Sequence, residues 1–193
     1  YPLIGNYGVS DEDFESTRVH ANACIVREAC PAPMHYRSKR SLHEFLEAGG
    51  TPGMAGVDTR AIVRKVRSHG VMPAVLTQVD AETLADREQL AVAVEKLSRE
   101  TKQFNYSATD YVLKVASKKK AIYGAKGFDK KVALIDCGAK HSIVRELVRH
   151  KLQVIVMPPT ALAKEVLAEE PAGVVVSNGP GDPSTNHYVV KTL

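Results

Sequence analysis

The residues that point most directly to chemistry lie in the stretch VVVSNGPGDP, residues 174–183. Three valines predict a strand, and the loop that follows carries two glycines and two prolines. Gly179 and Gly181 have no Cβ, so their N–H groups can come close to a ligand. Pro180 and Pro183 restrict φ and lower the entropy lost when the loop becomes ordered. Backbone donors held in this way suit a phosphate or the oxyanion of an acyl-transfer reaction.

A phosphate site is the weaker interpretation of this loop. A P-loop requires the pattern GxxxxGK[ST], and no lysine follows at the required place. A dinucleotide fingerprint requires a glycine three residues after Gly181, where this chain has Ser184. Asp182 would also place negative charge beside a phosphate. The sequence therefore favours an oxyanion site, and a rigid structural turn is the alternative that stays open.

An oxyanion site serves a nucleophile, and we find none in a suitable sequence context. Cys137 follows a predicted strand in IDCGAK, but it lacks the GxCxG elbow that would present its sulfur. Ser177 has no GxSxG context either, and His141 and His187 have no evident cysteine partner. We therefore expect Cys137 to be a buried structural cysteine. No catalytic residue is predicted in this sequence.

Residues 131–193 alternate between strand and helix patterns, which predicts βαβ units on a parallel sheet. The predicted strands are 131–138, 153–158 and 173–179, and the predicted helices are 139–151 and 161–170. Thr160 is the expected N-cap of the second helix, and a further helix is expected after residue 184. A loop at the carboxyl end of the third strand would lie where open α/β sheets bind ligands.

Residues 1–113 lack this repetition and predict a smaller α+β domain. Strands are expected at 22–30 and 71–78, and helices are expected to begin after the caps Ser41, Asp58 and Asp80. The helix after Asp58 carries Arg60, Arg64 and Arg67 on one face. This face is either solvated, with or without ion pairs between domains, or it contacts an acidic partner surface.

A lysine-rich stretch joins the two predicted domains. Residues 114–131 hold seven lysines and one aspartate, so this stretch carries +6 and the rest of the chain −2 of the net charge of +4. Few aromatic side chains and no arginines interleave with these lysines, which argues against a nucleic-acid site. We therefore predict a basic linker over 114–130 and no specific nucleic-acid partner.

The composition excludes several other classes of protein. Hydrophobic residues make up 44% and charged residues 25% of the chain, as in soluble globular proteins. No apolar run reaches the about 18 residues that span a membrane, and no signal peptide opens the chain. The three cysteines form no CxxC pair, so neither a disulfide framework nor a metal site is predicted. A reducing cytoplasm is the expected compartment.

Several stretches of the sequence carry a resemblance to one family. SNGPGDP at 177–183 resembles the loop of the class I glutamine amidotransferases, in the version found in small subunits of carbamoyl-phosphate synthetase. YPLIGNYGVSDEDFES at 1–16 and GMAGVDTRAIVRKVRSHG at 53–70 resemble the N-terminal domain of these small subunits. VALIDCGAKHSIVREL at 132–147 resembles the start of their amidotransferase domain. The resemblance implies an α/β fold in which residues 131–193 form the first half of a flavodoxin-like parallel-sheet domain.

The resemblance also implies a function. Small subunits of this family hydrolyse L-glutamine with a cysteine, a histidine and a glutamate, and they pass ammonia to a large subunit. The large subunit uses ATP, Mg²⁺ and bicarbonate to make carbamoyl phosphate for arginine and pyrimidine synthesis. Carried over to this sequence, Gly179 and Gly181 contact bound glutamine and help to form the oxyanion hole. The implied assembly is a heterodimer, and no cofactor is expected in this chain itself.

The catalytic residues of the family are expected outside this sequence. By typical element lengths, the nucleophile elbow lies roughly 20–25 residues beyond the loop, which is past Leu193. We therefore expect the chain to be truncated at both ends and to have no glutaminase activity alone. The alternative interpretation is a non-catalytic module that only docks on the large subunit.

Overall fold

The computed structural model describes residues 2–193 in two compact units, Tyr1–Asn105 and Tyr106–Leu193. The division falls somewhat before residue 113, and the domain limits predicted from the sequence stay predictions.

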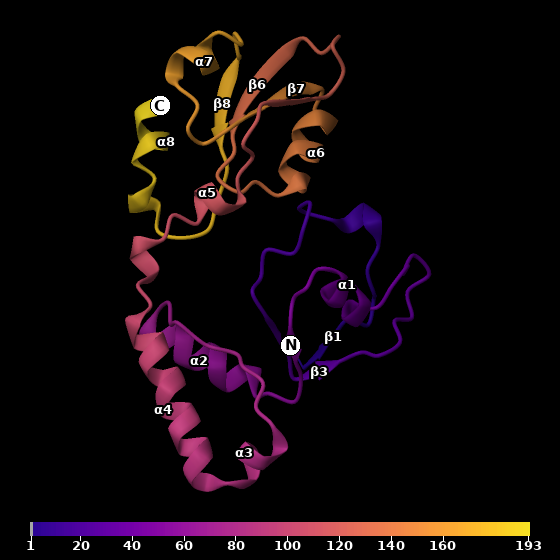
Figure 1. Ribbon diagram of the computed structural model, residues 1–193. Coiled ribbons are helices and arrows are strands. Elements are labelled where there is room, and N and C mark those ends of the chain that lie inside the picture. Colours follow the sequence, from indigo (N-terminus) through magenta and orange to yellow (C-terminus); the bar gives the residue numbers. More distant parts are fainter. Residues whose placement is uncertain (1) are drawn as a thin grey trace. The chain divides into compact units, whose positions relative to one another are not determined.

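A mixed four-stranded sheet forms the centre of the second unit (Figure 1). Its strands, in the order β5-β7-β6-β8, are β5 (Ala121–Tyr123), β7 (Leu152–Met157), β6 (Lys130–Ile135) and β8 (Gly173–Val176). The central strand β6 runs parallel to both β7 and β8, with Leu134 opposite Val156 on one side and Val175 on the other. This arrangement confirms the predicted α/β fold with a parallel sheet.

Helices cover both faces of this sheet, as a parallel sheet requires. Helix α6 (His141–Arg149) lies on one face, and α5 (Val112–Val115), α7 (Ala163–Leu167) and α8 (His187–Thr192) contribute to the other (Figure 1). Alternate residues of β6 explain the division, because Leu134 packs toward α6 while Ala133 and Ile135 pack toward α7 and α8. The 3-10 turns η2 (Tyr106–Ala108) and η3 (Pro183–Thr185) complete the unit.

Two local predictions for this unit differ from the structure. The lysine-rich stretch that we expected to be a linker contains β5, which pairs antiparallel with β7 at the edge of the sheet. Thr160 does not cap α7, because the N–H of Ala161 bonds to the carbonyl of Pro158 and the chain makes a turn first. The helix starts after Leu162 instead, whose N–H donates to the Glu165 carboxylate over 2.7 Å.

The first unit is built from very short strands and from helices. Two parallel pairs join β1 (Leu3–Ile4) to β3 (Glu28–Ala29) and β2 (Cys24–Ile25) to β4 (Gly53–Met54). The remaining elements are η1 (Asp11–Asp13), α1 (Leu42–Ala48), α2 (Thr59–His69), α3 (Ala81–Ala85) and α4 (Arg87–Gln103). The predicted N-caps are confirmed: Ser41 forms a capping box with Glu44, and Asp58 and Asp80 accept backbone N–H groups of their own helices.

The predicted strand at 71–78 is wrong, since these residues form no regular element. Pro73 has no N–H to donate to a ladder, and Val71 and Val75 are exposed. The strand predicted at 22–30 is interrupted, so that its two halves pair with different partners, β4 and β1.

Helix α2 is uncovered on all sides from Arg60 to His69 within the described part of the chain. Its apolar residues Ile62 and Val66 are each 41% exposed, and its arginines are exposed as well. Both the basic and the apolar face of α2 are thus open to solvent. Among residues 2–193, no helix combines the length and the apolar character needed to cross a membrane.

Candidate functional site

The order of the strands places the loop at residues 177–183 at a topological switch point. The chain passes from β6 to β7 on one side of β6 and then crosses to β8 on its other side (Figure 1). The loops that leave the carboxyl ends of β6 and β8 therefore lead to helices on opposite faces of the sheet, and the carboxyl ends of the strands at such a switch point are where open α/β sheets bind ligands. The loop after β6 is residues 136–139, and we call the loop after β8 the 177–183 loop.

Ser177 joins these two loops. Its side chain is buried, and its Oγ accepts the N–H of Cys137 over 2.9 Å and donates to the carbonyl of Asn178 over 2.8 Å. Its own N–H donates to the carbonyl of Ile135. The hydroxyl of Ser177 is thus used to hold the backbone, which is a structural role.

The carboxylate of Asp136 organises the loop after β6. It is buried and accepts backbone N–H groups from Ser117, Gly138 and Ala139, each over 2.8 Å. Burial by itself would raise the pKa of Asp136, but these hydrogen bonds outweigh it, and the pKa of the carboxyl lies below its ordinary value. The site therefore holds a buried ionised carboxylate beneath the 177–183 loop.

The two glycines of the 177–183 loop are required for different reasons. A Cβ on Gly179 would overlap the carbonyl oxygen of Cys137, so only glycine fits there. Gly181 has a φ of +86°, which side chains rarely adopt, and a Cβ there would lie 3.2 Å from the ring of Tyr111. The structure thus gives each glycine a backbone reason, and their predicted contact with a ligand stays a prediction.

The N–H groups of the loop are open to a ligand. Within residues 2–193, the N–H groups of Gly179 and Gly181 donate to no protein acceptor. The carboxylate of Asp182 turns back on its own loop, where it accepts the N–H of Ser184 over 2.9 Å. This hydrogen bond lowers the pKa of Asp182, which keeps a negative charge on the exposed side of the loop. Free backbone donors beside a carboxylate suit a polar, neutral or zwitterionic ligand better than a phosphate.

Cys137 lies next to the loop but is not prepared for nucleophilic attack. Its side chain is buried, and burial together with the charge of Asp136 raises the pKa of its thiol. Its Sγ has no hydrogen bond to a histidine in the described structure; His141 opens α6 and His187 opens α8. These observations support the prediction that Cys137 is a structural residue.

Sequence reasoning missed the residues that support the loop from outside. Asp110 and Tyr111 precede α5: Tyr111 lies against Gly181 of the loop, and Asp110 bonds to Tyr188 of α8, the helix that follows the loop. The Tyr188 hydroxyl donates to Asp110 across 78 positions of sequence. No local pattern could have revealed this pair, because neither residue lies in a motif.

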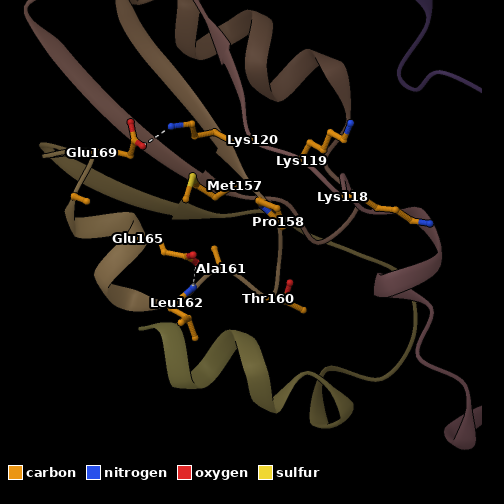
Figure 2. Close-up of a pocket in the computed structure, with 11 residues that line it drawn as sticks. Lys118, Lys119, Lys120, Met157, Pro158, Thr160, Ala161, Leu162, Glu165 and Glu169 are labelled. Atoms are coloured by element: carbon orange, nitrogen blue, oxygen red, sulfur yellow. Dashed lines mark hydrogen bonds and ion pairs between the residues drawn. The ribbon is translucent and has the colours of Figure 1, made fainter.

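A separate pocket of about 790 Å³ opens at the carboxyl end of β7 (Figure 2). Its walls come from lysines 118–120, from the turn after Met157 and from α7. Figure 2 shows Lys120 and Glu169 pointing toward each other, and their charged atoms are 2.6 Å apart. No residue of the 177–183 loop lines this pocket, so it is not the predicted glutamine cradle. Within the described range, no three His, Cys, Asp or Glu side chains gather as metal ligands would.

Comparisons with known proteins agree with the fold. A model of the class-I glutamine amidotransferases matches residues 133–193, and a model of the carbamoyl-phosphate synthase small chain, CPSase domain, matches residues 1–76. Residues 133–193 thus belong to a class-I glutamine amidotransferase domain, and residues 1–76 belong to the CPSase domain of the small chain.

Curated relatives narrow this class to one family. Carbamoyl phosphate synthase small chains of Bacillus caldolyticus and Fusobacterium nucleatum are 39% and 42% identical over 183 residues, 95% of this chain. The pyrimidine-specific small chain of Halalkalibacterium halodurans is 40% identical over the same length. The chain belongs to the family of carbamoyl phosphate synthase small chains. It spans about half the length of these relatives, 46% and 47%.

Proposed function

We propose that this chain carries part of the L-glutamine site of a glutamine-hydrolysing carbamoyl-phosphate synthase. In this role the small chain releases ammonia from glutamine, and a large chain uses the ammonia with bicarbonate and ATP to make carbamoyl phosphate. The observation that carries the proposal is the pair of free N–H groups, on Gly179 and Gly181, at the switch point between β6 and β8.

The geometry suits the stabilisation of an oxyanion. Backbone donors are most effective when they are fixed before the reaction, since no reorganisation is then needed as charge develops on the amide oxygen of glutamine. Ser177 ties the loop to the N–H of Cys137, and Asp136 holds the neighbouring loop through three hydrogen bonds. These hydrogen bonds restrain the backbone that carries the donors of Gly179 and Gly181.

The loop supplies hydrogen-bond donors, but hydrolysis of glutamine also needs a nucleophile. The resemblance assigns it to a cysteine in a GxCxG elbow, with a histidine and a glutamate to activate it. Cys137 is buried, has a raised pKa and has no histidine bonded to it in the described structure. We therefore propose that the 193-residue chain binds glutamine without hydrolysing it.

Titration of the isotope-labelled chain with L-glutamine tests both parts. We expect the amide resonances of Gly179 and Gly181 to shift while that of Gly127, which lies in open space, stays unchanged. No ammonia is expected above the buffer background. The glutamine site is contradicted if the loop amides do not respond at millimolar glutamine. Ammonia release near the rate of a complete small chain would contradict the inactivity alone.

The proposed partner is the large chain of carbamoyl-phosphate synthase, in a heterodimer. The exposed arginines and exposed apolar residues of α2 support such a contact, because they offer a basic and partly apolar surface to an acidic one. ATP and Mg²⁺ would be used by the large chain. The cytoplasm and the pathways to arginine and pyrimidines remain part of this proposal.

Charge reversal on α2 tests the contact with the large chain. Arg64→Glu is expected to weaken the complex on the order of tenfold at low salt, and less at high salt, because it places like charges together. Arg87→Glu, an equal charge change at the start of α4, is the control and should leave affinity unchanged. Equal affinities of wild type and Arg64→Glu for the large chain would show that α2 is not part of the interface.

The interaction module without glutamine binding is the second candidate. The open surface of α2 favours it independently of the loop. A chain that binds the large chain and leaves the loop amides unchanged in glutamine would support this candidate. A specific nucleic-acid role is not proposed, and two lysines of the basic stretch are engaged: Lys120 pairs with Glu169, and Lys131 donates to the Glu169 carbonyl.

A further inference from the structure

Residues 110–117, which we call the support segment, touch the candidate site at several points. The segment lies between the stretches that match the two family models, and it includes α5. Figure 1 shows α5 beside the carboxyl ends of β6 and β8. The contacts of this segment reach both loops of the site, so its role goes beyond connecting two units.

The strongest contact is a hydrogen bond between Tyr188 and Asp110. The Tyr188 hydroxyl lies 2.9 Å and 3.1 Å from the two carboxylate oxygens of Asp110, and 3.1 Å from the side-chain oxygen of Asn186. The same carboxylate accepts the N–H of Leu113 over 3.0 Å at the start of α5. Asp110 therefore joins the support segment to α8, which follows the 177–183 loop in the chain.

The rest of the support segment packs directly on the loops. The ring of Tyr111 lies against Gly181 and stacks on Tyr106 with centroids 5.0 Å apart. Val115 fills the space beside Gly138, where an added Cβ would lie 2.8 Å from its Cγ2. The N–H of Ser117 donates to Asp136. The segment thus holds the loop after β6 and the 177–183 loop against each other.

We infer that Asp110 and Tyr188 are positioning residues, whose hydrogen bond clamps the 177–183 loop in the conformation that presents the N–H groups of Gly179 and Gly181. The inference rests on the proposed function of that loop. Neither residue needs to touch glutamine, because their bond holds the support segment to α8, the helix that follows the 177–183 loop. Loss of the clamp should make the loop more mobile and weaken its ligand, since a flexible donor must be ordered on binding.

Tyr188→Phe in the 193-residue chain tests the clamp, because it removes the hydroxyl and keeps the ring. We expect hydrogen exchange at the hydrogen-bonded amides in and beside the loop, those of Cys137, Thr185 and Asn186, to become about tenfold faster, as for the loss of a hydrogen bond to a charged group. Exchange in β6 and β7 should not change. The affinity for L-glutamine should fall by a similar factor. The matched control is Tyr123→Phe on β5, whose hydroxyl has no bond to another described residue.

Two further variants separate the clamp from general loss of structure. Asp110→Ala should reproduce the effect of Tyr188→Phe, and it carries the test if Tyr188→Phe fails to fold. Asp110→Asn keeps an oxygen acceptor and should restore much of the protection. Unchanged loop exchange in Tyr188→Phe and in Asp110→Ala overturns the clamp, whether or not glutamine binds. If exchange responds as expected but the wild-type chain binds no glutamine, the clamp stands and the proposed function falls.

Discussion

Gly179→Ala is expected to destabilise the second unit by about 3 kcal/mol and to abolish glutamine binding. The added Cβ would overlap the carbonyl oxygen of Cys137, which is held in place by the β6–β8 pairing and by Ser177. The loop can avoid this overlap only by moving away from β6, which would displace the N–H groups of Gly179 and Gly181. Urea unfolding followed by circular dichroism, together with a glutamine titration, measures both effects.

Alanine substitutions at two other glycines provide reference values for the free-energy change of Gly179→Ala. Gly127 has open space around its missing Cβ and no positive φ, so Gly127→Ala should change the free energy of unfolding by less than about 0.5 kcal/mol. Gly181→Ala should lower the free energy of unfolding by an intermediate amount, about 1–2 kcal/mol, because it places alanine at a φ of +86°. A Gly179→Ala chain as stable as Gly127→Ala would show that the loop does not pack on Cys137.

Asp136→Ala is expected to cost about 3–5 kcal/mol of stability at neutral pH, the second large effect. The variant would leave the N–H groups of Ser117, Gly138 and Ala139 without their acceptor beneath the loop. The free energy of unfolding at pH 7 measures the loss. Asp182→Ala is the control, because Asp182 is exposed and its hydrogen bond to the N–H of Ser184 is local, so its loss should be much smaller.

The pH dependence of the free energy of unfolding is a second way to measure the contribution of Asp136. The folded pKa of Asp136 lies below its ordinary value, so its contribution is fully present above the unfolded pKa of about 3.9. This contribution is lost as the pH falls through the lower folded pKa. Wild type and Asp136→Asn should therefore differ most above about pH 5 and converge as the pH falls through the lower folded pKa. A difference in stability that stays constant over this range would contradict the assignment.

Local patterns in the sequence predicted those parts of the fold that depend on neighbours in the chain. Ser41, Asp58 and Asp80 cap their helices because a short polar side chain reaches the N–H groups two or three residues on. The strands β6, β7 and β8 follow from apolar runs that a doubly covered sheet requires. In these cases the physical cause lies within a few residues of the element.

The missed features depend on partners that are remote in sequence. β5 is three residues long and lies in a lysine-rich stretch, and it forms a strand because β7 offers an unpaired edge. Residues 71–78 have strand-like composition but no partner strand in the described structure, so the strand predicted from this composition does not form. In the site, the loop and its glycines were predicted, whereas the contacts of Ser177, Asp136 and Asp110 required the three-dimensional structure.

The short strand β5 makes the two edges of the sheet unequal. It covers the outer side of β7 with an antiparallel strand flanked by lysines, and such edges resist pairing with further strands. On the opposite edge, β8 keeps Val174 and Val176 exposed at 45% and 40%. The two edges of the sheet therefore differ: an additional strand can pair with β8, next to the 177–183 loop, whereas the lysines that flank β5 disfavour pairing there.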